Sequence, residues 1–445
     1  MSADNKRMER RVSSSRRRLL QSIGIATVVG LAGCASNLGG KSNDQISGDG
    51  QSNVKTTLQV AGWGGETEAK LTRKWLDSFE SNHKAISTEY NQIPWSQYKQ
   101  KLQTQLGAGQ APDAFYVDAS YYQEFAQSGA LLDFTQYMEE SAEYDAEEIF
   151  DGLKDFWKRD GKWQGIPKDF QVLGLWYNTN LFNQAGITSQ PKTWTGFRTA
   201  LTNLKEKTDV AYPLLQNSSG IATLWLFYPF IEQNGGKIIS DDGSECLVAS
   251  DKGIEALEYL IGMKKDKLIG TPDEVGIDSS YAALGKGAVA LGYDGNWIGA
   301  NLEDKYPKED EKFDIFTHTP HPSNGEKFEL FISAGWTSPT KGDNPEQSWE
   351  LIKSLTSVDG QKEWAKQGNA LPIYESLRNM NYYENHSRRQ KLLNATKWMG
   401  AWAYGPETGG ILNDLSSELS ASMLGKKTPQ EALETAQSKI NNRLK

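Results

Sequence analysis

The sequence predicts an α/β fold in which a mainly parallel sheet is covered by helices. Short apolar runs alternate with helical stretches from Thr56 onward, and no repeat or low-complexity tract interrupts this pattern. Such alternation is typical of strand–helix–strand units. The composition is that of a globular chain, with 38% hydrophobic and 24% charged residues among 445. It excludes disorder as the main architecture and leaves room for two sheets.

Three strands, each followed by a helix, are expected at the start of this pattern. The strands are TLQVAGW, AISTEYNQI and DAFYVD, and the helices cover about residues 67–80, 96–106 and 120–127. In open sheets of this kind, ligands bind beyond the carboxyl ends of the strands. Trp63 and Asp118 stand at the carboxyl ends of the first and third of these strands, so both mark the place where a ligand would be met.

Two further apolar segments extend the pattern. The second series begins near Gly165, passes through VLGLWYN and continues to ALGKGAVALGYDGNW. The third segment, FELFISAGWTSP, predicts a strand that leads into a loop and then into a helix at about 345–357. Periodicity alone does not say whether the chain crosses between two sheets once or several times.

The N-terminus is typical of an export signal followed by a tether. SRRRLL at Ser15–Leu20 resembles a twin-arginine motif, and the apolar stretch after it is too short and interrupted to span a membrane. The tetrapeptide Leu-Ala-Gly-Cys that ends at Cys34 resembles a bacterial lipobox, which implies removal of residues 1–33 and lipidation of Cys34. Residues 34–55 are rich in Gly, Ser, Asn and Asp, and we expect a flexible tether there. Export by the general route, and an amphipathic N-terminus with a chance cysteine, stay open.

Charge and cysteine content disfavour several partners and sites. The net charge is −9 although basic residues gather at the N-terminus, which argues against nucleic acid or anionic lipid as the main partner. Only Cys34 and Cys246 occur, so no disulfide framework is expected and Cys246 is interpreted as a small packed residue. His318 and His321 lie in a proline-containing loop and do not predict a metal site. The chain has 14 tryptophans, and we expect some of them to do more than fill a core.

Short motifs along the body of the chain resemble those of one family. GLWYNTNLFNQAGI at Gly174–Ile187, followed by PKTW, is similar to the signature of the extracellular solute-binding proteins of ABC importers. This is the large sugar-binding family that includes maltose- and trehalose-binding members. QAPD, GKWQGIP, LGKGAVA, GNW, SAGW and GNALP are further matches to it. The resemblance covers the chain from about residue 56 to the C-terminus.

The resemblance implies a two-lobed periplasmic-binding-protein fold of type II, with two mainly parallel sheets flanked by helices and a ligand cleft between the lobes. The N-terminal lobe would hold residues 56–166 and 317–365, and the C-terminal lobe residues 167–316 and 366–445. The crossings between the lobes would fall near Gly165–Asp169, near Phe316–Pro320 and after Gly360.

Aromatic rings beside carboxylates, amides and glycines are the residues expected to bind a sugar, because a sugar has C–H faces and hydroxyl edges. The expected ligand-binding residues are Trp63, Gly64, Glu66, Asp118, Tyr121, Asp169, Phe170, Trp176, Asp294, Trp297, Gly335, Trp336, Trp402 and Tyr404. Asp118 is also a good N-cap for a helix that starts near Ser120. Of two neighbours in an apolar strand, we expect Trp176 to face the cleft and Tyr177 to pack.

Six further tryptophans are assigned to core or surface packing. They are Trp157, Trp163, Trp194, Trp225, Trp349 and Trp364.

The function that the resemblance implies is capture of a sugar or glycoside-type osmolyte outside the cell and its delivery to an ABC permease. We expect a monomer held at the membrane by its lipid anchor, with no cofactor, no metal and no catalytic step. A secreted carbohydrate-active enzyme stays open, because Asp118 and Asp294 could face each other across a cleft. A binding protein for a cation such as a polyamine, or for iron through Tyr121–Tyr122 or Tyr382–Tyr383, is the other alternative.

Overall fold

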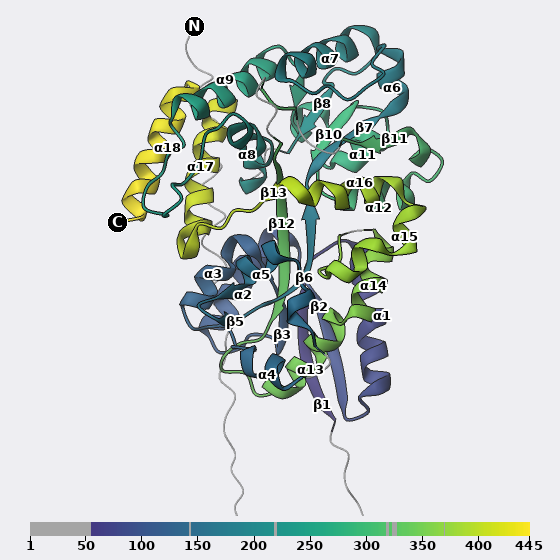
Figure 1. Cartoon of the computed structure of the whole chain (residues 1–445), viewed down its shortest axis with the longest axis vertical. Coiled ribbons are helices and arrows are strands. Elements are labelled where there is room, and N and C mark those ends of the chain that lie inside the picture. Colours follow the sequence, from purple (N-terminus) through teal and green to yellow (C-terminus); the bar gives the residue numbers. More distant parts are fainter. Residues whose placement is uncertain (1–54, 142–143, 218–219, 317–319, 323–326, 369) are drawn as a thin grey trace, which may run out of the picture. The chain divides into compact units, whose positions relative to one another are not determined.

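The computed structural model describes residues 55–141, 144–217, 220–316, 320–322, 327–368 and 370–445. These residues belong to one compact unit, which begins near residue 53 (Figure 1). The signal peptide predicted for residues 1–33, the lipidated Cys34 and the tether up to residue 54 lie outside the described residues.

The first sheet has the strand order β13-β12-β3-β1-β2, and a sixth strand, β6, also pairs with β12. Its strands are β1 (Thr56–Gly62), β2 (Ile86–Gln92), β3 (Ala114–Asp118), β6 (Ile166–Val172), β12 (Glu329–Thr337) and β13 (Met399–Gly400). β1 runs parallel to β2 and β3, whereas β12 runs antiparallel to β3 and β6. Helices α1 (Glu66–Asn82), α2 (Trp95–Gly107) and α3 (Ala119–Gln127) follow the first three strands. The strand–helix alternation expected from Thr56 onward is thus confirmed.

The second sheet has the order β11-β7-β10-β8-β9. Its strands are β7 (Gly174–Asn178), β8 (Leu214–Gln216), β9 (Ile269–Gly270), β10 (Leu291–Asp294) and β11 (Phe313–Ile315). β8 pairs in parallel with β9 and β10, and β7 is antiparallel to β10 and β11. Each sheet therefore combines a parallel portion with antiparallel strands.

Helices cover both sheets (Figure 1). They are α4 (Thr135–Glu140), α5 (Asp151–Trp157), α6 (Thr179–Gln184), α7 (Trp194–Lys207), α8 (Leu224–Gln233), α9 (Asp251–Lys265), α10 (Pro272–Val275), α11 (Ser280–Gly285), α12 (Trp297–Lys305), α13 (Pro345–Thr356), α14 (Val358–Gln367), α15 (Asn381–Glu384), α16 (Ser387–Ala395), α17 (Thr408–Met423) and α18 (Pro429–Arg443). Short 3₁₀ helices are η1 (Ala146–Glu148), η2 (Gly220–Thr223), η3 (Asp310–Lys312), η4 (Glu375–Asn379), η5 (Thr396–Trp398) and η6 (Gly405–Glu407). A short hairpin joins β4 (Lys158–Arg159) to β5 (Lys162–Trp163).

The paired strands β6 and β12 connect the two sheets (Figure 1). Only Leu173 separates β6 in the first sheet from β7 in the second, and its N–H donates to the carbonyl of Leu330 in β12 at 2.9 Å. Both leucines are fully buried in the hydrophobic core of the second sheet. Two chain segments are therefore held together where the chain passes between the sheets. The lobe boundaries given above stay a prediction.

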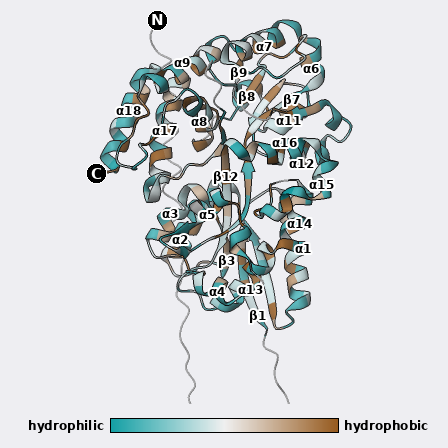
Figure 2. Cartoon of the chain, viewed as in Figure 1, coloured by the Kyte–Doolittle hydropathy of each residue, from teal (hydrophilic) through white to brown (hydrophobic). Residues whose placement is uncertain are grey.

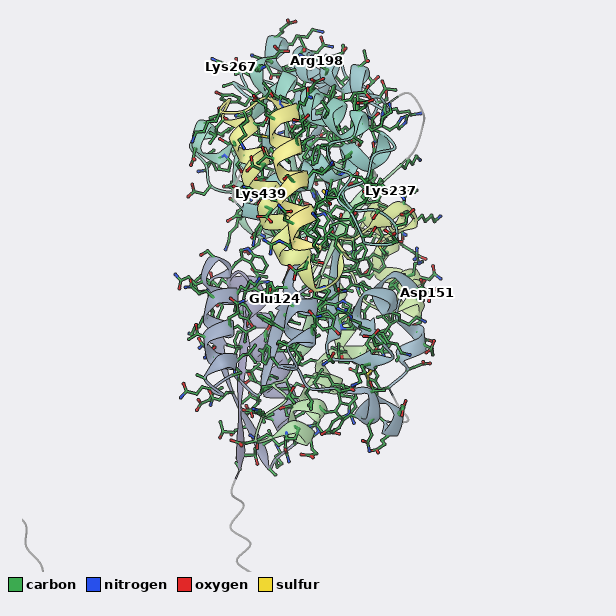
Figure 3. All side chains as sticks on the ribbon, turned by 90° about the vertical axis from the view of Figure 1, so that its left-hand side faces the viewer. Glu124, Asp151, Arg198, Lys237, Lys267 and Lys439 are labelled. Carbon is green, nitrogen blue, oxygen red and sulfur yellow. The ribbon has the colours of Figure 1, made fainter. Side chains whose placement is uncertain are left out.

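Each sheet has its own hydrophobic core. The helices bury one face, as α13 does with Trp349, Ile352 and Leu355. Teal is prominent along α1 and α18 in Figure 2, in keeping with their low share of apolar residues. Charged side chains such as Glu124, Arg198 and Lys439 project from the helices in Figure 3. Among the described residues, no helix combines the length and the apolar character needed to cross a membrane.

Candidate functional site

A cavity of about 560 Å³ is lined by strands β3, β6 and β12 of the first sheet, by helices α1, α2, α3 and α14, and by helices α8, α11 and α12 that pack beside the second sheet. Its size lies within the range of small-molecule binding sites. The lining residues are Trp63, Gly64, Gly65, Glu66, Thr67, Glu68, Trp95, Asp118, Ala119, Ser120, Lys168, Asp169, Gln171, Ile221, Trp225, Tyr281, Trp297, Asn301, Lys305, Phe331, Ile332, Ser333, Ala334, Trp364, Ala401 and Trp402. Because β6 and β12 contribute to this lining, the cavity lies at the strands that connect the sheets.

Indole rings are the main apolar component of the cavity. Six of the 14 tryptophans line it, namely Trp63, Trp95, Trp225, Trp297, Trp364 and Trp402. The ring centroids of Trp63 and Trp95 lie 5.0 Å apart at 70°, and those of Trp225 and Trp297 lie 5.9 Å apart at 61°. Edge-to-face pairs of this kind hold the rings in place. Four of the six lining indoles are thus held in two indole–indole pairs.

Glycines place Trp63 at the carboxyl end of β1. A Cβ atom on Gly62 would lie 2.7 Å from the ring of Tyr116, so only glycine allows that ring to pack against the strand end. Gly64 has φ of +122°, a conformation that glycine adopts readily, and the chain turns there into α1. Trp63 is left with its ring 4.8 Å from Tyr98 and 5.0 Å from Tyr116.

A charged cluster of Glu68, Lys168 and Asp169 lies at one side of the cavity. The Lys168 ammonium contacts Asp169 Oδ2 directly and lies 3.2 Å from Glu68 Oε1. The register of β6 against β12 advances by two residues between Asp169 and Pro167, so β6 carries Lys168 as an extra residue. A bulge of this kind redirects side chains, which explains how two consecutive strand residues reach each other.

The protonation states in this cluster follow from burial and from the neighbouring charges. Burial disfavours charge on Lys168, but the carboxylates of Asp169 and Glu68 outweigh it and hold the pKa of the ammonium above its usual value. Burial raises the pKa of Glu68, and the Lys168 ammonium limits this rise. The cluster is therefore one buried cation held between two carboxyl groups.

Asp118 both caps α3 and lines the cavity. Its Oδ1 accepts the backbone N–H of Ser120 at 2.9 Å, as an N-cap does. Burial raises the pKa of Asp118, and the hydrogen bonds from Ser120 oppose that rise. The capping role and the place at the cavity, which the sequence allowed to hold at once, occur together.

Half of the residues expected to bind a ligand line the cavity. They are Trp63, Gly64, Glu66, Asp118, Asp169, Trp297 and Trp402. The other seven are not among the lining residues. Whether the lining residues bind a ligand stays a prediction.

Of the two neighbouring rings in β7, Tyr177 packs as expected, stacked on Phe316 at 4.3 Å, but the expectation that Trp176 faces the cleft is wrong. Trp176 is 1% exposed and lies against Gly299, where an added Cβ would come within 2.7 Å of the indole. Tyr177 is only partly buried and its hydroxyl donates to Asp314 at 3.3 Å. β7 is an inner strand with both faces covered, so alternation does not separate a core face from a cleft face.

The prediction that Gly335 and Trp336 bind the ligand is also wrong, because neither residue lines the cavity. Trp336 is 1% exposed, and its ring centroid lies 4.3 Å from that of Tyr116. A Cβ on Gly335 would meet the ring of Trp157 at 2.7 Å, so this glycine permits close packing of Trp157. Both positions serve the core of the first sheet.

Four further expected residues are absent from the cavity lining for similar reasons. Phe170 is fully buried against Phe150, and Tyr121 is buried beside Phe125. Asp294 is buried at the end of β10, and Tyr404 is packed against the core of the second sheet.

Several lining residues were missed. Trp95 begins α2 shortly after β2 and is 49% exposed. The rule that identified Trp63, a ring just beyond the carboxyl end of a strand, would have identified it. Trp225 and Trp364 lie in helices, where the sequence predicts that they pack. No local pattern distinguishes them from tryptophans of the core. Glu68 and Lys168 become recognisable only when α1 and β6 are brought together.

Within the described part of the chain, no group of three His, Cys, Asp or Glu side chains is arranged to hold a metal ion. The tyrosine pairs proposed for iron do not line the cavity. Cys246 is buried, as expected of a packed residue, and burial raises the pKa of its thiol to about 11.

Asp294 gives a prediction about stability and pH. Burial raises its pKa to about 6, although the N–H of Gly295 donates to its Oδ1 at 2.9 Å. The stabilisation from its protonated form is complete below the unfolded value of 3.8 and is lost as the pH rises through 6. We expect Asp294→Asn to raise the free energy of unfolding at pH 7 by about 3 kcal/mol and to leave it unchanged near pH 3.5.

Denaturant unfolding of both proteins between pH 3.5 and pH 7 measures this difference. A constant difference between wild type and variant across this range would contradict the assignment of the titration to Asp294.

Comparison with known proteins gives the family. The model of the bacterial extracellular solute-binding protein family matches residues 63–362. The diacetylchitobiose binding protein of Streptomyces coelicolor is 24% identical over 441 residues, which cover 96% of this chain and 99% of that protein.

Two solved structures have the same fold. An ABC substrate-binding protein of Listeria monocytogenes in complex with cycloalternan has a TM-score of 0.78 and 24% identity, and the match covers 88% of this chain and 99% of that one. A solute-binding protein of Thermotoga lettingae bound with α-D-tagatose has a TM-score of 0.79 and 22% identity, covering 88% and 100%. The predicted two-lobed fold is confirmed, and the chain belongs to the family of bacterial extracellular solute-binding proteins.

Proposed function

We propose that this protein captures a sugar or a glycoside-type osmolyte in the 560 Å³ cavity and delivers it to the permease of an ABC importer. The observation that carries the proposal is the grouping of six indoles with carboxylate and amide side chains around one cavity. Indole faces stack on the C–H faces of a pyranose, and carboxylates and amides meet its hydroxyl groups. Relatives of the chain bind diacetylchitobiose, cycloalternan and tagatose, which supports a carbohydrate.

Unpartnered polar atoms favour a hydroxylated ligand over a polyamine. The indole N–H groups of Trp225 and Trp402 and the Oδ1 atom of Asp169 are buried without a hydrogen-bond partner among the described residues. All three side chains line the cavity. Hydroxyl groups can accept from the indoles and donate to the carboxylate, whereas a protonated amine can only donate. The excess of carboxylates over lysines in the lining is the feature that would favour a cation instead.

Delivery requires that the permease distinguish the loaded protein from the empty one. In the proposed mechanism the two lobes close over the ligand, because the closed form makes contacts with it that the open form lacks. Stacking supplies much of the apolar burial, and a hydroxyl that is missing or inverted leaves a buried polar group unpaired at a cost of about 1–3 kcal/mol. No covalent step is needed, so the protein is proposed to be a carrier and not an enzyme.

Location outside the cytoplasmic membrane is part of the proposal. The basic and apolar segment before Cys34 and the lipobox-like tetrapeptide support export and lipidation, and the Gly- and Ser-rich stretch after it supports a tether. The protein would act as a monomer at the outer face of that membrane.

A thermal-shift screen tests the proposed function. The panel is maltose, D-tagatose, diacetylchitobiose, D-mannitol, spermidine and ferric citrate, each at 1 mM so that general stabilisation by concentrated sugars is avoided. A ligand present at 100 times its dissociation constant is expected to raise the free energy of unfolding by about 2.7 kcal/mol. Stabilisation by spermidine or ferric citrate alone would overturn the sugar proposal. Release of reducing sugar from the oligosaccharides would identify an enzyme.

A further inference from the structure

Trp364 makes a hydrogen bond that joins a distant helix to the carboxylate of Asp169. Its Nε1–H donates to Asp169 Oδ2 at 2.9 Å, and Lys168 contacts the same oxygen. Asp169 is 0% exposed and lines the cavity, and its Oδ1 is buried with no partner among the described residues. Oδ2 of this carboxylate thus has two partners, the Trp364 indole and the Lys168 ammonium, whereas Oδ1 has no partner among the described residues.

Helix α14 binds this part of β6 with two side chains from one face. Gln361 and Trp364 are three residues apart, which places them on the same side of the helix. Gln361 Nε2 donates to the carbonyl of Lys168 at 2.7 Å, while Trp364 binds the side chain of the next residue, Asp169. The helix therefore fixes both the backbone of the bulge and the direction of the carboxylate.

The indole itself has little freedom to move. Its ring centroid lies 5.3 Å from that of Trp75, and the Lys168 ammonium lies 4.1 Å from the ring centre on its face. Trp364 is 1% exposed. A cation over an indole face is attracted by the ring quadrupole, so the same side chain also helps to hold the lysine beside Asp169.

We propose that Trp364 is a positioning residue that acts through Asp169. Its N–H holds Oδ2 next to Lys168, so that Oδ1 stays available as an acceptor for one hydroxyl group of the ligand. The inference rests on the proposed function and deepens it, because it names Asp169 as the carboxylate that binds a ligand hydroxyl and Trp364 as the residue that orients this carboxylate. A buried carboxylate oxygen without a partner is costly, and a ligand hydroxyl removes that cost only if the oxygen faces it.

A double-mutant cycle on ligand affinity tests the inference. Trp364→Phe keeps a ring over Lys168 and removes the N–H. With whichever of maltose, D-tagatose and diacetylchitobiose binds in the thermal-shift screen, we expect calorimetric titration to show affinity about tenfold weaker, as for loss of a charge-assisted hydrogen bond. In an Asp169→Ala background, the same change is expected to alter affinity by less than about twofold, because no carboxylate is left to orient.

The matched control is Trp349→Phe. Its Nε1–H donates to Ser141 Oγ at 3.0 Å, and Trp349 does not line the cavity, so the variant loses the same kind of hydrogen bond elsewhere. Affinity is expected to stay at the wild-type value in this control. An equal loss from Trp364→Phe with and without Asp169 would show that the indole acts on the ligand itself and would overturn the inference. So would wild-type affinity in Trp364→Phe.

A measurement without ligand separates this inference from the proposed function. In ¹⁵N-tryptophan spectra of the ligand-free protein, the Trp364 indole signal is assigned by its loss in Trp364→Phe. We expect this signal to move when Asp169 is replaced by alanine or asparagine; an unmoved signal in both variants overturns the inference even if a sugar binds. If no sugar in the panel binds, the proposed function fails and the inference fails with it. If a sugar binds without coupling in the cycle, the inference alone fails.

Discussion

Replacing Lys168 by methionine is expected to lower the free energy of unfolding at pH 7 by about 3–5 kcal/mol, as for other buried ion pairs that lose one partner. The lysine side chain is 5% exposed and lies between Glu68 and Asp169, whose side chains are 17% and 1% exposed. Methionine fills similar space, so the loss comes from two carboxyl groups left in a buried place without their cation. Denaturant unfolding monitored by circular dichroism measures it.

The pH dependence of this loss identifies its cause. Without the ammonium, burial raises the pKa of Glu68 beyond its already raised value, so the folded variant binds protons that the unfolded chain does not. The stability of Lys168→Met is then lost as the pH rises through that raised value, and the deficit against wild type is smaller at pH 5 than at pH 7. An equal deficit at both pH values would point to lost packing.

Lys305→Met is the matched control for this prediction. Lys305 also lines the cavity, but it is half exposed and pairs with Asp304 at 2.9 Å in solvent. Exposed pairs of this kind contribute little to stability. We therefore expect the melting temperature of Lys305→Met to match that of the wild type. A loss of stability as large as that of Lys168→Met would show that the cavity as a whole tolerates no change of charge.

Trp336→Ala and Trp297→Ala are expected to have opposite effects. Removing the fully buried Trp336 leaves a large void beside Tyr116 and is expected to lower the free energy of unfolding by about 3–5 kcal/mol. Trp297 is only partly buried and lines the cavity, with Trp225 at 5.9 Å. Its removal is expected to weaken sugar binding by tenfold or more through lost stacking, with a smaller change in stability.

Unfolding curves and calorimetric titration on the same two variants test this contrast. The folded fraction of Trp336→Ala should bind sugar with wild-type affinity, because its ring does not line the cavity. If Trp297→Ala lost stability and kept affinity, the indole would be a core residue and the stacking argument would fail.

Trp63 and Asp118 show what sequence reasoning could locate. Both stand at the carboxyl ends of parallel strands in the first sheet, and strand ends are readable because a strand–helix alternation is local. Trp95 stands at an equivalent place after β2, so the same rule covers it. The positions of these residues at strand ends, and the order of the elements around them, can be predicted from residues nearby in the chain.

Trp336 and Trp176 show where such reasoning fails. β12 pairs with β3 on one side and with β6 on the other, and eight of its nine residues are buried. A strand covered on both faces has no alternation that separates core from cavity. The direction of each ring there depends on which helices cover the sheet, which no short motif records.

The acidic character follows from composition, and the strand–helix alternation and the tryptophans at strand ends follow from local pattern, because they depend on residues close together in sequence. The contact between Trp364 and Asp169 joins positions that are 195 apart, and Lys168 reaches both through a bulge set by pairing with β12. Such contacts exist only after the sheets and helices have packed. Which indoles face the cavity, and which carboxylate oxygen is left without a partner, therefore follow from long-range packing and burial.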